Sequence, residues 1–226
     1  MSASGEPAES KLSGLTAGAQ LDWPSTTDPD LYAGVHRVIA AVAALGGAVG
    51  WLHEPARAEV DRWLDALMGQ VQAGRARLLV VRRDGRIEAL GYWARLAGVV
   101  FERNAEVRKV MTHPDARGQG LARLVVRSLV RDAATAGVEV LVLDVRGNNH
   151  AALDLYESEG FTVYGRLPDL IAVGNERFDR VCFYRDLGRP PGVVRHGGRV
   201  EGPGASTGRG AVARPPGGSD PGPFGA

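Results

Sequence analysis

The sequence predicts a mixed α/β (α+β) protein in which helices pack on the faces of one mixed β-sheet. Two segments near the start have apolar residues at helical spacing. Two apolar runs then flank a tight-turn signal, and the second half alternates between helix and strand patterns with glycine at most boundaries. The chain of 226 residues is long enough for one such domain with flexible ends.

Two helices are expected first. Asp28 followed by Pro29 is typical of a helix start, because the carboxylate can cap the first turn and proline suits the first helical position. Apolar residues recur at helical spacing up to Leu45, and two glycines then end the pattern. A second helix is expected to begin near Pro55 and to end at Gly74.

Three strands are expected next. The apolar run at residues 76–81 is followed by Asp84-Gly85, a strong signal for a two-residue hairpin, and the chain returns over residues 86–96. Residues 107–112 form the third strand. Its start is open, because residues 101–104 fit either a strand or a turn.

The second half predicts two more helices and three more strands. Helices are expected at residues 118–136 and 149–159. Between them, residues 138–145 are almost continuously apolar, as in a strand covered on both faces. A further strand begins at Gly160-Phe161, and residues 177–187 read as the last strand.

Residues 1–19 and 188–226 are predicted to be disordered, which leaves a domain over residues 20–187. The C-terminal segment holds 12 glycines and 7 prolines, and too few large apolar groups to offset the entropy of ordering. We find no secretory signal and no apolar run long enough to span a membrane, so the cytoplasm is the default location.

Charge and cysteine content exclude several classes of protein. Lys and Arg number 27 against 26 Asp and Glu, which gives no strong attraction to nucleic acid or to an anionic membrane. The single cysteine, Cys182, can form neither an internal disulfide nor a thiolate metal cluster. The five histidines show no metal-ligand spacing, so no metal is expected.

The most informative stretch is the turn that follows the third strand. Gly118 and Gly120 flank Gln119 where a helix opens, and Arg117 adds a positive charge. Glycine lets a ligand approach the backbone, and the first turn of a helix presents unpaired N–H groups, so the turn suits a diphosphate. A glycine-capped loop that only turns the chain is the alternative. A Walker loop and a dinucleotide fingerprint both fail on spacing, since Arg123 stands where the latter needs a small residue.

Two motifs resemble those of the GNAT family of N-acetyltransferases. Residues 117–122, Arg-Gly-Gln-Gly-Leu-Ala, resemble the acyl-CoA loop of that family. Residues 149–161, from Asn149 through Tyr156 to Gly160-Phe161, resemble its second signature. The resemblance covers about residues 20–187 and implies a GNAT-like fold, with a central twisted mixed sheet of about six to seven strands flanked by about four helices.

The resemblance also implies acetyl-CoA as cofactor, with coenzyme A as product, and a set of residues that bind it. Backbone groups of the strand before the turn would bind the acetyl and pantetheine parts, at Val110, Met111 and Thr112. The turn and the helix start would bind the diphosphate, through Arg117, Gly118, Gln119, Gly120, Leu121, Ala122 and Arg123. Asn149 would contact the cofactor, and Tyr156 would protonate the departing thiolate.

The base that deprotonates the acceptor amine is open between two carboxylates. Asp144 lies near the end of a buried strand, where a ligand crevice would open, and it is our first choice. Glu106, on the strand that leads into the loop, is the second. Either carboxylate could instead be a salt-bridged or solvated group. His113 has a suitable ordinary pKa but fits a turn position equally well.

The acceptor is open as well. Segments around Trp51, Trp63 and residues 165–184 resemble a subgroup similar to the tabtoxin-resistance acetyltransferases, which implies a small primary amine such as a toxin or antibiotic. Residues 145–149 instead resemble protein N-terminal acetyltransferases. A non-catalytic acyl-CoA sensor is the third alternative. A homodimer is one alternative for the oligomeric state.

Overall fold

The computed structural model describes residues 16, 18–47, 50–51 and 53–188. The helices are α2 (Pro29–Ala44), α3 (Arg57–Gln72), α4 (Leu121–Thr135) and α5 (His150–Ser158), with short 3-10 helices η1 (Val99–Phe101) and η2 (Pro114–Ala116). The strands are β1 (Gln20–Asp22), β2 (Ala76–Arg83), β3 (Arg86–Arg95), β4 (Asn104–Thr112), β5 (Val140–Arg146), β6 (Thr162–Val173) and β7 (Glu176–Asp186).

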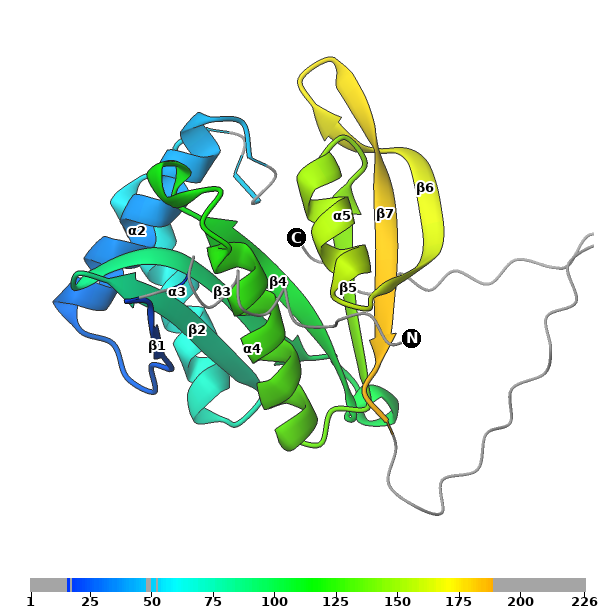
Figure 1. The fold of residues 1–226 in the computed structure, drawn as a ribbon, viewed down its shortest axis with the longest axis horizontal. Helices are drawn as coiled ribbons and strands as arrows, with labels where there is room; N and C mark the ends of the chain where they lie inside the picture. The colour runs from blue at the N-terminus through cyan, green and yellow to red at the C-terminus, as the bar shows by residue number, and fades with distance from the viewer. Residues whose placement is uncertain (1–15, 17, 48–49, 52, 189–226) are drawn as a thin grey trace, which may run out of the picture. The chain divides into compact units, whose positions relative to one another are not determined.

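The strands of the described residues form one seven-stranded sheet in the order β1-β2-β3-β4-β5-β7-β6. Every neighbouring pair is antiparallel except β4 and β5, which run parallel. Figure 1 shows α2 and α3 on one side of the β1–β4 half, with α4 on its other side and α5 beside the β5–β7 half. The predicted mixed sheet with helices on its faces is confirmed.

The predicted cap and turn residues form the expected local structures. The Asp28 carboxylate accepts a hydrogen bond of 2.7 Å from the Leu31 amide and caps α2, with Pro29 at the first helical position. Asp84 and Gly85 both have positive φ angles, and they form the two-residue turn between β2 and β3. Gly74 has a φ of 68° directly after α3, where only glycine adopts that angle without strain.

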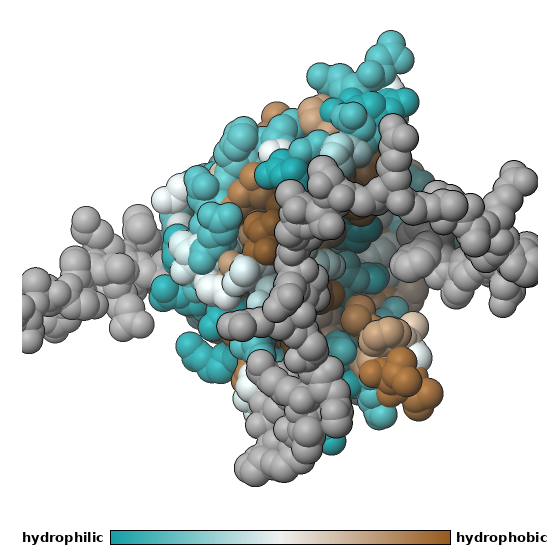
Figure 2. All heavy atoms as spheres, turned by 90° about the vertical axis from the view of Figure 1, so that its right-hand side faces the viewer, coloured by the Kyte–Doolittle hydropathy of each residue, from teal (hydrophilic) through white to brown (hydrophobic). Residues whose placement is uncertain are grey.

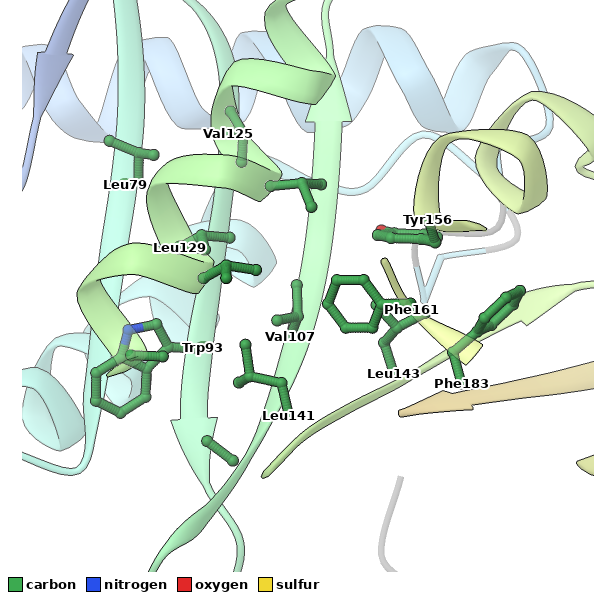
Figure 3. Packing of buried hydrophobic residues seen from close by; sticks show 14 of the residues in the cluster. Leu79, Trp93, Val107, Val125, Leu129, Leu141, Leu143, Tyr156, Phe161 and Phe183 are labelled. Carbon is green, nitrogen blue, oxygen red and sulfur yellow. The ribbon is translucent and has the colours of Figure 1, made fainter. Parts of the chain in front are cut away.

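Two apolar cores lie on opposite faces of the sheet. The α4–α5 core, part of which Figure 3 shows, includes Leu79, Trp93, Val107, Val125, Leu129, Leu141, Leu143, Tyr156, Phe161 and Phe183. The α2–α3 core includes Leu31, Val35, Leu64, Leu78, Leu90, Tyr92 and Met111. Because side chains alternate along a strand, membership of a core tells which face each strand residue occupies.

The sheet parts between β4 and β5. Their pairing covers only Asn104 to Glu106 on β4, and Glu106 opposite Val142 is its last pair. From Val107 onward, β4 still pairs with β3, but no strand of the described residues pairs with its other edge. A β-bulge lies within this open stretch, where the register with β3 shifts opposite Gly91 and Lys109 has a φ of 49°. The open edge leads straight into the turn before α4.

Three details differ from the sequence predictions. The short edge strand β1 was missed, because three residues carry no periodic signal. Residues 99–101, ahead of the uncertain strand start, form the 3-10 helix η1. Helix α4 begins at Leu121 rather than at Gly118, since both glycines adopt left-handed angles outside the helix. The predicted disordered ends fall almost wholly outside the described residues.

The outer strand of the sheet on the side opposite β1 is β6, a twelve-residue strand whose side chains are mostly exposed. Its exposed large apolar residues are Val163, Tyr164, Leu167 and Leu170. Figure 2 faces this side of the domain and shows hydrophobic residues among hydrophilic ones. Within the described residues, every helix is too short or too polar to cross a bilayer.

Candidate active site

The turn between β4 and α4 is built to leave backbone amides free. Helix η2 follows His113, whose ring nitrogen accepts a weak hydrogen bond of 3.4 Å from the Asp115 amide. Gly118 and Gly120 then adopt φ angles of 74° and 73°, and α4 begins at the next residue. Among the described residues, none accepts a hydrogen bond from the amides of residues 118–123. These amides and the positive end of α4 together form an anion site.

Side chains around this turn support its shape. A guanidinium nitrogen of Arg83, at the end of β2, donates to the side-chain oxygen of Gln119. Arg123 and Arg127 of α4 both pair with Glu159, whose side chain is only 5% exposed. The Arg123 guanidinium is therefore engaged beside α5, and its predicted contribution to diphosphate binding would come from its amide.

The open edge of β4 provides a second binding element. Val110 packs against the α4–α5 core, whereas Met111 lies buried in the α2–α3 core. The Thr112 hydroxyl is buried, and no group of the described residues forms a hydrogen bond with it. A buried hydroxyl without a protein partner and an unpaired strand edge both call for a ligand with amide and carbonyl groups. The pantetheine chain of acetyl-CoA has such groups, so these residues fit it.

Tyr156 lies where α5 faces the parting of the sheet. Its ring contacts Phe161 and Phe183 at centroid distances of 5.6 and 6.1 Å. Figure 3 shows the ring beside Phe161, with its hydroxyl end directed toward β4. Burial raises the pKa of the Tyr156 phenol well above its usual range, and the negative charge of Asp144 raises it further. The phenol therefore keeps its proton at physiological pH.

Of the other predicted site residues, Asn149 caps a helix, and Asp144 and Glu106 each pair with an arginine. Asn149 is the N-cap of α5, and its side-chain oxygen accepts from the Ala152 amide at 3.3 Å. Asp144 accepts a hydrogen bond of 2.6 Å from Arg180 on β7. Glu106 accepts one of 2.7 Å from Nε of Arg108. Both candidate bases are thus ion-paired carboxylates.

Both carboxylates lie on the face of the sheet opposite α4 and α5. Ala105 and Val107 belong to the α4–α5 core, so Glu106 between them points to the other face. Leu143 and Val145 place Asp144 on that same face. The turn and Tyr156 lie on the α4–α5 side. The site therefore has two sides that meet where β4 and β5 part.

Comparison with known proteins identifies the family to which the site belongs. The model of the acetyltransferase (GNAT) family matches residues 44–161. The chain belongs to the GNAT family. That match includes the open β4 edge, the glycine turn and Tyr156, and it confirms the family that the two motifs indicated.

Individual GNAT proteins resemble parts or most of the chain. An L-amino acid N-acyltransferase of Escherichia coli K12 is 33% identical over 82 residues, which cover 36% of this chain and 46% of that protein. The ribosomal protein bS18-alanine N-acetyltransferase of the same strain is 30% identical over 109 residues, which cover 48% of this chain and 70% of that protein. The aligned region is thus about half the length of the first relative.

A solved GNAT structure shows the same fold. The phosphinothricin acetyltransferase of Sinorhizobium meliloti, crystallised in complex with acetyl-CoA, superposes with a TM-score of 0.63 at 19% identity. The superposition covers 76% of this chain and 89% of that one. The prediction of a GNAT-like fold is confirmed, and the prediction of an N-acetyltransferase is confirmed at the level of the family.

Several residues of this GNAT site escaped the sequence analysis. Arg83 and Glu159 are ordinary surface-type residues in the sequence, and only the fold brings them beside α4. Arg108 pairs with Glu106 and Arg180 pairs with Asp144, while Lys109 follows Arg108 in β4. No three acidic, histidine or cysteine side chains of the described residues come together in a way that could hold a metal ion.

Proposed function

We propose that the chain is an acetyl-CoA-dependent N-acetyltransferase that acts on the primary amine of a small molecule. One observation carries the proposal: the open edge of β4 leads directly into an amide-lined turn at the start of α4, on the same side of the sheet as Tyr156. A long ligand with amides at one end and a diphosphate at the other matches that arrangement.

The donor side of the site binds and orients. The amides of residues 118–123 would hold the diphosphate, while Thr112 and the free edge of β4 would hold the pantetheine chain. When bound, acetyl-CoA supplies the acetyl group as an activated thioester. A backbone N–H near Met111 or Thr112 would stabilise negative charge on the acetyl oxygen. Placing the thioester at the parting of β4 and β5 exposes it to the opposite face.

Proton transfer would involve a residue from each side of the site. The Asp144 carboxylate, which is paired with Arg180, would take a proton from the acceptor ammonium directly or through one water molecule. The neutral amine would form the N–C bond as the C–S bond breaks. Tyr156, which its raised pKa keeps protonated, would give its phenolic proton to the sulfur. The second proton that leaves the nitrogen would restore the phenol, so that the products are a neutral amide and a thiol. Glu106 is the second choice of base, since Arg108 already holds it through two nitrogens.

Two glycines with matched geometry test the donor site. Gly118 and Gly74 have φ angles of 74° and 68°, and a methyl group added to either would meet no protein atom within 4 Å. Alanine at each site should therefore lower stability equally, by about 1 kcal/mol. Only Gly118→Ala should raise the KM for acetyl-CoA, by about tenfold, because the ligand approaches that backbone. Equal KM values for the two variants would contradict the site.

The reaction itself is tested by coenzyme A release from acetyl-CoA, with panels of small amines and of peptides. Release with small amines supports the proposal. Release only with peptides would favour a protein N-terminal acetyltransferase, which the ribosomal relative makes the second candidate. Acetyl-CoA binding without coenzyme A release in the presence of any amine would favour a non-catalytic acyl-CoA sensor. The cytoplasmic location and the homodimer stay predictions.

A further inference from the structure

The bulge in β4 places two neighbouring cations on one face of the sheet. Val107 and Val110 both pack on the α4–α5 core, although a regular strand would put residues 107, 109 and 111 on one face. The extra residue reverses the alternation, as the position of Met111 in the α2–α3 core confirms. Arg108 and Lys109 therefore both lie on the acceptor face.

The Lys109 ammonium is held in place by aromatic rings. Its Nζ lies 4.1 Å from the ring centroid of Trp51 and 5.4 Å from that of Trp63. The two rings pack edge to face at 6.0 Å, and Trp63 also contacts Tyr92 at 5.9 Å. Lys109 adopts its position at a φ of 49°, an angle that strains a non-glycine residue. Strain of this kind is concentrated at functional sites.

Charges of both signs surround the parting of β4 and β5 on this face. Glu106 pairs with Arg108, and Asp144 pairs with Arg180. Lys109, which follows Arg108 in β4, adds a third cation on this face of the sheet. A zwitterion complements such a cluster, because its ammonium can meet a carboxylate while its own anionic group meets the cations.

From this juxtaposition we infer that Arg108 and Lys109 bind a carboxylate of the acceptor, which is therefore an amino-acid-like zwitterion with its amine directed toward Asp144. The inference rests on the proposed N-acetyltransferase function and narrows its acceptor. An uncharged amide or a simple alkylamine lacks the group that the two cations recognise. A peptide N-terminus lacks a carboxylate beside its amine, so this arrangement also selects against it.

The first test uses the unaltered full-length chain. Coenzyme A release is measured for L-amino acids, each compared with its carboxamide and with its decarboxylated amine. The free acid should have a kcat/KM at least about tenfold higher, as expected for a charge-assisted hydrogen bond. Equal values for acid and amide would overturn the inference while leaving the proposed function intact. No release with any amine would instead contradict the proposed function.

The second test assigns the preference to Lys109. Lys109→Met keeps a long side chain against the tryptophans and removes the charge. It should raise the acceptor KM about tenfold, reduce the acid-to-amide ratio toward one, and leave the KM for acetyl-CoA unchanged. The control is Arg131→Gln, which removes an exposed cation on the far side of α4 and should change none of these values. An undiminished acid preference in folded Lys109→Met would overturn the assignment.

Discussion

Lys109 is expected to lower the stability of the folded protein, and removing its charge should therefore raise that stability. Burial is the main cause that lowers the pKa of the Lys109 ammonium from 10.5 to about 8, and the charge of Arg108 adds to it. The perturbation is Lys109→Met, which removes the charge, keeps the side chain's length and leaves the backbone angle unchanged. The aromatic contacts with Trp51 and Trp63 stay available to the methionine sulfur.

The magnitude follows from that pKa. A fall from 10.5 to about 8 corresponds to about 3 kcal/mol of unfavourable free energy for the protonated form. Attraction between the ammonium and the two rings offsets about 1–2 kcal/mol of this. Lys109→Met should therefore increase the free energy of unfolding at pH 7 by about 1–2 kcal/mol.

The sign of the pH dependence is fixed by the same pKa. Between pH 8 and 10.5 the unfolded chain binds more protons at this lysine than the folded chain does, so stability rises with pH across that window. Below pH 8 the unfavourable contribution is fully present. The advantage of Lys109→Met over the natural chain should therefore be largest at pH 7, smaller at pH 10, and lost only above pH 10.5.

The assay is urea unfolding of the natural chain, Lys109→Met and Lys109→Arg at both pH values. Arginine stays charged throughout, so the gap between the methionine and arginine variants should persist at pH 10. A methionine variant that is less stable than the natural chain at pH 7 would refute the reasoning. So would a stability difference that is the same at both pH values.

Two further variants probe Tyr156 and Glu159. Tyr156→Phe keeps the ring contacts with Phe161 and Phe183, so its melting temperature should stay close to that of the natural chain. Its kcat should fall about 100-fold with little change in the KM for acetyl-CoA, and an unchanged rate of coenzyme A release would remove its role as acid. Glu159→Gln leaves Arg123 and Arg127 without their buried counter-charge and should lower the free energy of unfolding in urea by about 3 kcal/mol. The exposed Glu157→Gln serves as its control, and an equal effect of both changes would contradict the pairing.

The donor half of the site could be predicted from the sequence because its signals are local. A strand that ends at Thr112, just before Pro114, two glycines with left-handed angles and a helix start all lie within one short stretch. The residues proposed to bind through the backbone need only this local order. Tyr156 and Asn149 follow from a second local motif on α5.

The acceptor half could not be predicted in the same way, because tertiary structure assembles it. A lysine at a φ of 49° contradicts local propensity, so the bulge that turns Lys109 toward Trp51 and Trp63 leaves no sequence signal. The pairs formed by Asp144 with Arg180 and by Glu159 with Arg127 join residues about thirty positions apart. Asp144 was expected near a crevice, but its ion pair depends on the register of β5 with β7.

This division between the two halves has a consequence for function. The diphosphate and the pantetheine chain would be held by backbone groups, which many sequences can provide with the same geometry. The proposed acceptor would instead meet side chains from α3, β4, β5 and β7, and a change in any one of them would alter the charge or the shape of the acceptor site. Two relatives are accordingly named for different acceptors, one for an L-amino acid and one for a ribosomal protein. Acceptor choice in this chain should accordingly depend on the charges around Lys109 rather than on the glycine turn.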